Sequence, residues 1–148
     1  IEKVHMSGKG RVLIFGAGPI GIMHGYLAKS KYKCQQLDFV EVNEYRQKSL
    51  KDLNIADNIY TKEEFQDNVP RLEKSYNYVF TACSVFDTHK NGIKMLENGG
   101  SINFFGGLSR TYVPRPMFLI YPLSSQSFCG CSSRNRLSRR ASLLYTNF

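Results

Sequence analysis

Three glycines with G-x-G-x-x-G spacing, Gly16, Gly18 and Gly21, directly follow an apolar run that ends at Phe15. Each glycine has a physical task in binding an anion. Gly16 allows a tight turn out of a strand, Gly18 lets a ligand approach the backbone, and Gly21 lets the next helix pack closely. Pro19 suits the first helical turn, where its missing N–H costs nothing. The free amides and the positive dipole end of that helix would then face a phosphate group.

An acid, Glu41, lies twenty residues after Gly21, at the end of a second apolar segment. Strand, glycines, helix and distal acid in this order indicate a Rossmann dinucleotide-binding site. A carboxylate there can accept hydrogen bonds from ribose hydroxyls and repels a 2′-phosphate, which favours NAD over NADP. Asp38 and Glu44 are competing acids, one too early in the strand and one already in the next helix. Arg46 either lies near the adenosine ribose or is a solvated helix residue.

The elements that position these residues alternate along the chain. The apolar patterns predict strands at 11–16, 37–42, 58–60, 78–83 and 102–105, and helices at 19–31, 43–53, 61–68 and 86–96. This alternation predicts an α/β fold, a Rossmann-type doubly wound parallel sheet with helices on both faces. Ligands bind at the carboxyl ends of such strands, so the glycine loop should share one crevice with Cys83, Ser84, Gly106 and Gly107. Ordinary turn chemistry explains Ser84 equally well.

Other reactive side chains do not form a catalytic pattern. The four cysteines have no disulfide-framework spacing, and the Cys129–Cys131 pair has no second pair at zinc spacing. His89 belongs to an apolar helical stripe, which favours packing between helix and sheet or at an interface over catalysis. We therefore assign no catalytic residue and no metal ligand in this chain.

Charge divides the 148 residues into two parts. The net charge is +8, but all 12 acids lie in residues 1–110, whereas residues 111–148 hold five Arg, no Lys and no acid. We expect a dinucleotide-binding domain over 1–110 and an atypical basic Ser/Arg-rich tail over 111–148. The last part of the sheet would then be incomplete or replaced by an irregular tail. The tail could bind RNA or membranes, but out-of-frame translation is favoured because the shift falls inside an expected domain.

Four segments together resemble one family: RVLIFGAGPIG, FVEVNEYR, NYVFTACS and LENGGSINFFGGL. They are similar to the cofactor domain of zinc-type medium-chain dehydrogenases, close to sorbitol, threonine and alcohol dehydrogenases. The resemblance runs from about Gly10 to Leu108. It implies that the loop with Pro19 and Ile20 holds the pyrophosphate of NAD, with Glu41 and Arg46 at the second strand.

The resemblance also implies what the complete protein does. It implies NAD-linked oxidation of a secondary alcohol or polyol by a homo-oligomeric, cytoplasmic enzyme with a catalytic zinc. The zinc ligands of that family lie on a separate domain that is not visible here, so we interpret the chain as a fragment that is inactive alone. A non-catalytic NAD-binding module is the alternative, and an S-adenosylmethionine methyltransferase fits less well because Phe15 replaces the usual acid. No apolar run reaches transmembrane length, and neither membrane nor nucleic-acid binding is expected.

Overall fold

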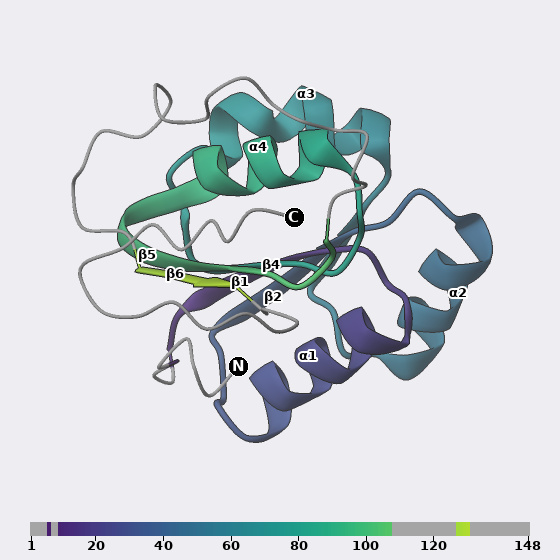
Figure 1. Ribbon diagram of the computed structural model, residues 1–148. Helices are drawn as coiled ribbons and strands as arrows, with labels where there is room; N and C mark the ends of the chain where they lie inside the picture. Colours follow the sequence, from purple (N-terminus) through teal and green to yellow (C-terminus); the bar gives the residue numbers. More distant parts are fainter. Residues whose placement is uncertain (1–5, 7–8, 108–126, 131–148) are drawn as a thin grey trace.

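The computed structural model describes residues 6, 9–107 and 127–130, and these form a parallel α/β sheet with helices on both faces (Figure 1). The strand order is β3-β2-β1-β4-β5-β6. The strands are β1 (Arg11–Phe15), β2 (Gln36–Val40), β3 (Asn58–Tyr60), β4 (Tyr76–Thr81), β5 (Leu96–Phe104) and β6 (Ser127–Gly130). The helices are α1 (Pro19–Ser30), α2 (Glu44–Leu53), α3 (Lys62–Leu72) and α4 (Phe86–Met95). The predicted doubly wound Rossmann fold is confirmed.

Two apolar cores lie on opposite faces of the sheet. On one face Ala28 of α1 and Leu50 of α2 pack against the strands, and on the other Phe65 of α3 and Met95 of α4 do so. Figure 1 shows α3 and α4 above the sheet and α1 and α2 below it. The central strands are buried from both sides, which explains why their sequences are continuously apolar rather than alternating.

Most element boundaries differ from the sequence prediction by no more than two residues, and α3 and β5 differ by more. Helix α3 continues past Asn68 to Leu72, with Pro70 inside it, because Phe65 and Leu72 remain buried against the sheet. Strand β5 begins at Leu96 rather than at residue 102. Leu96 pairs with Tyr76, and the register then shifts, so the turn-forming residues Asn98, Gly99 and Gly100 lie within the strand at an irregularity. Tertiary pairing overrides the local turn pattern here.

The sequence prediction did not include a sixth strand. Strand β6 pairs in parallel with β5, from Ser101 opposite Ser127 to Phe104 opposite Gly130. Its four residues come from the segment expected to be an irregular tail, whose change in composition hid any strand pattern. The rest of residues 111–148 lies outside the described residues, so the prediction of a separate tail stays a prediction.

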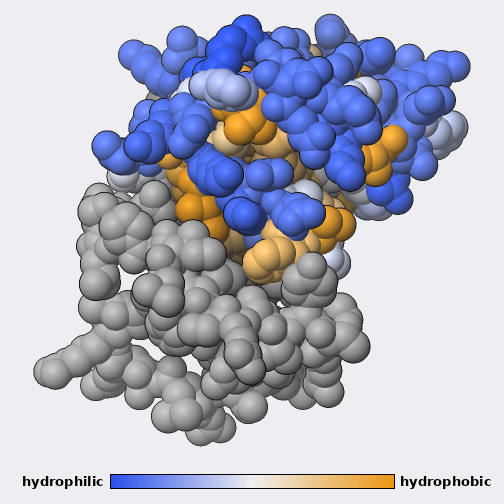
Figure 2. Space-filling model, turned by 90° about the horizontal axis from the view of Figure 1, so that it is seen from above, coloured by the Kyte–Doolittle hydropathy of each residue, from blue (hydrophilic) through white to orange (hydrophobic). Residues whose placement is uncertain are grey.

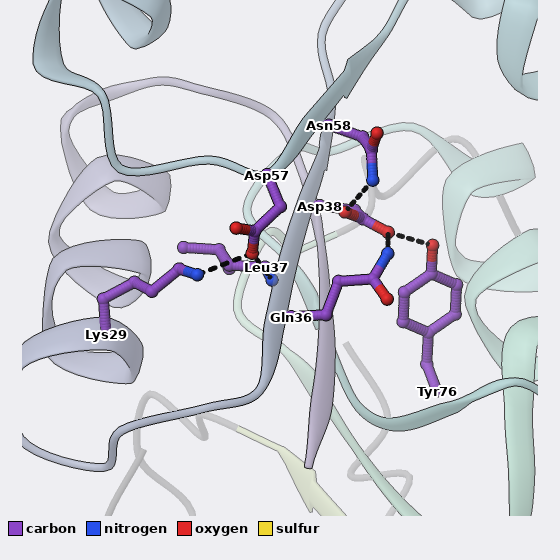
Figure 3. Close-up of polar contacts among 7 residues, drawn as sticks. All are labelled: Lys29, Gln36, Leu37, Asp38, Asp57, Asn58 and Tyr76. Carbon is purple, nitrogen blue, oxygen red and sulfur yellow. Dashed lines mark hydrogen bonds and ion pairs between the residues drawn. The ribbon is translucent and has the colours of Figure 1, made fainter. Parts of the chain in front are cut away.

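A polar network at the amino half of the sheet surrounds Asp38, which is fully buried on β2. Figure 3 shows its three donors: the Gln36 Nε2 atom at 2.7 Å, the Tyr76 hydroxyl at 2.6 Å and the Asn58 Nδ2 atom at 2.8 Å. Tyr76 belongs to β4 and Asn58 to β3, so the carboxylate joins three strands. Asp38 thus has a place inside the fold, away from the carboxyl ends of the strands.

The outer surface is mostly hydrophilic where it can be described. Figure 2 looks onto the face that carries α3 and α4, and polar side chains cover most of its described part. No helix formed by the described residues is long and apolar enough to cross a membrane. Large exposed apolar side chains do occur on α1 and α2, among them Met23, Tyr26 and Tyr45.

Candidate dinucleotide-binding site

The glycine loop begins with a turn that only glycine adopts easily. Gly16 has a φ of +95°, in the left-handed region, and its amide donates to the Val40 carbonyl at 2.9 Å. A Cβ on Gly21 would lie 2.0 Å from the Gly16 carbonyl oxygen, so the first turn of α1 rests directly on the loop. A Cβ on Gly18 would meet no atom within 4 Å. The loop is therefore tightly packed on one side and open at Gly18.

The first turn of α1 offers amide donors at this open position. Gly18 is the N-cap, Pro19 follows, and no side chain caps the helix. The first N–H groups of any helix have no partner within the helix, and they favour anions together with the helix dipole. Ile20, 37% exposed, lies at the same turn. The geometry thus provides a backbone site for a phosphate group, assembled from Gly18 and the two residues that follow Pro19.

Glu41 reaches the glycine loop from the end of β2. Its Oε2 atom accepts a hydrogen bond from the Ala17 amide at 2.6 Å, and its Oε1 atom accepts one from the Asn43 amide at 2.9 Å. The side chain is only 4% exposed. The Arg46 Nη1 atom lies 3.8 Å from Oε2, with the arginine side chain 53% exposed. The structure therefore brings Glu41 and Arg46 together beside the loop, and Glu44 is exposed in the first turn of α2.

The loops after β4 and β5 meet at the same edge of the sheet. A Cβ on Gly106 would lie 2.1 Å from the Cys83 carbonyl oxygen, and a Cβ on Gly16 would lie 3.4 Å from the Cys83 Cβ atom. Cys83 therefore stands between the two glycine turns. Ser84 and Gly107 are exposed, and a Cβ on Gly107 would meet no atom within 4 Å. All three loops named from the sequence converge at one edge.

Two histidines lie behind these loops, packed against aromatic rings. His89 is 4% exposed and its ring lies 4.8 Å from that of Phe104, between α4 and the sheet. Burial lowers the pKa of His89, although hydrogen bonding to the Gly106 and Cys83 backbone opposes this. His24 stacks on Phe80 at 5.1 Å, and burial lowers its pKa too. No pattern in the sequence predicts the aromatic contacts of His24.

The described residues do not suit a metal ion. No three of their His, Cys, Asp or Glu side chains gather in a way that could hold one. Cys34 is buried, Cys83 is partly buried, and both are free thiols. Burial raises the pKa of Cys34, which disfavours the thiolate that a metal requires. The Cys129 side chain and Cys131 lie outside the described part of the chain.

Comparison with known proteins finds a similar sequence and similar folds. No protein-family model matches the chain. L-threonine 3-dehydrogenase of Protochlamydia amoebophila (strain UWE25) is 32% identical over 99 residues, which cover 64% of this chain and 28% of that protein. The alcohol dehydrogenase TADH of Thermus sp. ATN1 has a TM-score of 0.71 at 19% identity, over 88% of this chain and 38% of that one.

Two further solved structures share the fold. L-idonate 5-dehydrogenase of Escherichia coli K-12 has a TM-score of 0.71 at 18% identity, over 87% of this chain and 36% of that one. A structure from Sinorhizobium meliloti 1021 is assigned to a zinc-binding dehydrogenase and is bound to NADP. It has a TM-score of 0.75 at 15% identity, over 87% of this chain and 39% of that one. The chain thus spans well under half of these proteins. These likenesses show that the chain shares the fold of these dehydrogenase structures, and the sequence similarity is to L-threonine 3-dehydrogenase.

Proposed function

We propose that this chain binds NAD at the glycine loop and is the cofactor domain of a dehydrogenase that transfers hydride between NAD(H) and a secondary alcohol or polyol. The observation that carries the proposal is the assembly around α1. An uncapped helix start, an unobstructed Gly18 and a buried carboxylate 2.6 Å from the loop lie together at the carboxyl edge of the sheet. The similarity to L-threonine 3-dehydrogenase supports it.

Each residue at this edge has a role in the proposal. The amides after Gly18 bind the pyrophosphate, and Glu41 and Arg46 contact the adenosine ribose. The loops at Cys83-Ser84 and Gly106-Gly107 form the rest of the crevice in which the dinucleotide lies. NAD supplies the hydride acceptor when bound, and this chain holds and orients it. The negative charge of Glu41 disfavours a 2′-phosphate, so we propose NAD rather than NADP.

The catalytic group is proposed to lie in the remainder of a longer protein. The described residues hold no group fit for zinc, so no step of the reaction is assigned to a metal here. We propose that the 148-residue chain alone binds NAD without catalysing hydride transfer. The same proposal includes a homo-oligomeric cytoplasmic parent protein with a small alcohol or polyol as its substrate.

A non-catalytic NAD-binding module would use the same loop and the same acid. A zinc-ligand domain encoded in the same gene would exclude that alternative. A methyltransferase is not favoured, because Phe15 is buried where the acid of a typical methyltransferase loop would lie.

Calorimetric titration of the full chain with NAD, NADP and S-adenosylmethionine tests the proposal. We expect NAD to bind at least tenfold more tightly than NADP, about 1.4 kcal/mol, and S-adenosylmethionine not to bind. Equal binding of NADP would contradict the proposed role of Glu41, and binding of S-adenosylmethionine alone would contradict the assignment. Dehydrogenase activity of the isolated chain on sorbitol, threonine or a secondary alcohol would contradict the proposal that the catalytic group lies outside this chain.

A further inference from the structure

Both oxygens of the Glu41 carboxylate are already bound to the protein backbone. Oε2 accepts from the Ala17 amide at 2.6 Å, and Oε1 accepts from the Asn43 amide at 2.9 Å. Ala17 lies inside the glycine loop, and Asn43 is the N-cap of α2. One buried side chain thus joins the loop after β1 to the turn after β2, across 24 positions of sequence.

The surroundings of this carboxylate give it a fixed position. The side chain is 4% exposed, and the Gln47 Nε2 atom binds the Glu41 carbonyl oxygen at 2.6 Å. Arg46 approaches from the solvent side at 3.8 Å. Hydrogen bonds from amides to an ionised acceptor are shorter and stronger than neutral ones. Removing the charge would leave the Ala17 amide buried with a weaker acceptor or with none, in the middle of the loop.

We propose that Glu41 is a positioning residue for the glycine loop, which it fixes in the shape that accepts the pyrophosphate. This inference rests on the proposed function and deepens it. An acid that only contacts the ribose binds its hydroxyls and distinguishes NAD from NADP, without affecting how the pyrophosphate is bound. An acid that also shapes the loop governs the part of the ligand that NAD and NADP share. Each carboxylate oxygen keeps a second lone pair, so the two roles are compatible.

Titration of the full chain and of the Glu41→Gln variant with NADH, NADPH and inorganic pyrophosphate separates the roles. Gln keeps the length of the side chain but has only one oxygen for the two backbone amides. We expect the affinity for all three ligands to fall by about tenfold, the effect of one charge-assisted hydrogen bond. A loss confined to NADH, with NADPH and pyrophosphate unchanged or tighter, would overturn the inference and leave the proposed function standing.

A matched control and a variant-free measurement complete the test. Glu44→Gln removes the same charge three residues away, at an exposed position that contacts neither amide, and should leave all three affinities within about twofold.

Hydrogen exchange of the Ala17 amide in the ligand-free wild-type chain does not require a variant to fold. Slow exchange there supports the inference, and exchange at the rate of an unprotected amide overturns it. Failure of wild-type protein to bind any dinucleotide would instead overturn the proposed function.

Discussion

At the residue scale, the three glycines of one motif do three different things. Gly16 needs its positive φ, Gly21 has no space for a Cβ, and Gly18 has free space around it. The first two therefore maintain the fold of the loop. Of the three, only Gly18 has room for a side chain within the protein itself. The absence of a side chain there points to a ligand that must approach the backbone.

This difference predicts opposite outcomes for two alanine substitutions. Gly21→Ala should lower the free energy of unfolding by about 1–3 kcal/mol or more, because a backbone carbonyl cannot move away from the new Cβ. Gly18→Ala should change it by less than about 1 kcal/mol, since only the N-cap preference changes, yet weaken NAD binding about tenfold or more. Urea unfolding and calorimetry measure the two effects. Loss of stability in Gly18→Ala with intact NAD binding would contradict this assignment.

At the element scale, the two ends of the sheet have different tasks. The amino half is held by the Asp38 network, which joins β2, β3 and β4 through side chains. The carboxyl ends are joined through loops: the Ala82 amide donates to the Phe15 carbonyl at 2.8 Å and the Gly106 amide to the Thr81 carbonyl at 2.8 Å. A ligand site formed from loops requires strands that are fixed relative to one another, and the network supplies part of that rigidity.

Removing one donor from the network tests this separation. Burial and the hydrogen bond to Asp38 raise the pKa of the Tyr76 hydroxyl. Tyr76→Phe leaves the fully buried carboxylate with one donor fewer, and we expect about 1–3 kcal/mol less stability in urea. NAD affinity should stay within about twofold, because the strands keep their order. Tyr45→Phe, at a residue 79% exposed, is the control and should change neither quantity. An equal loss in both variants would show that the network contributes nothing.

At the scale of the whole molecule, local patterns predicted most of the fold. The order of strands and helices follows from short-range signals, and the structure contains it. The sequence did not reveal β6, the full length of α3, or the hydrogen bond from the Ala17 amide to Glu41. Each of these depends on contacts between residues far apart in the chain, which spacing cannot show. The residues expected at the site lie together at one edge of the sheet because the carboxyl-end rule depends on the fold, and the predicted doubly wound fold was correct; their role in binding stays a prediction.

Global stability should depend on pH through His24, which is half-buried, and His89, which is buried. The His24 Nδ1 and His89 Nε2 atoms are buried and have no hydrogen-bond partner among the described residues, and protonation would turn both ring nitrogens into donors. Burial lowers both pKa values below the 6.5 of the unfolded chain. The unfolded state therefore binds more protons below about pH 6.5. The free energy of unfolding is therefore highest above about pH 6.5. It decreases as the pH falls from there through the pKa values of the two histidines in the folded state.

We accordingly expect the urea midpoint to fall between pH 7.5 and about 5.5, the window set by the ordinary histidine pKa. His89→Gln should make this decline shallower, because one of the two groups no longer gains a proton on unfolding. The substitution also changes the stability at pH 7.5. The quantity to compare is therefore the slope of the urea midpoint against pH, and not the midpoint at one pH. Lys90→Gln, an exposed change on the same helix, should keep the wild-type slope. An unchanged slope in His89→Gln would mean that this imidazole is protonated equally in both states, and that its burial between α4 and the sheet does not exclude the proton.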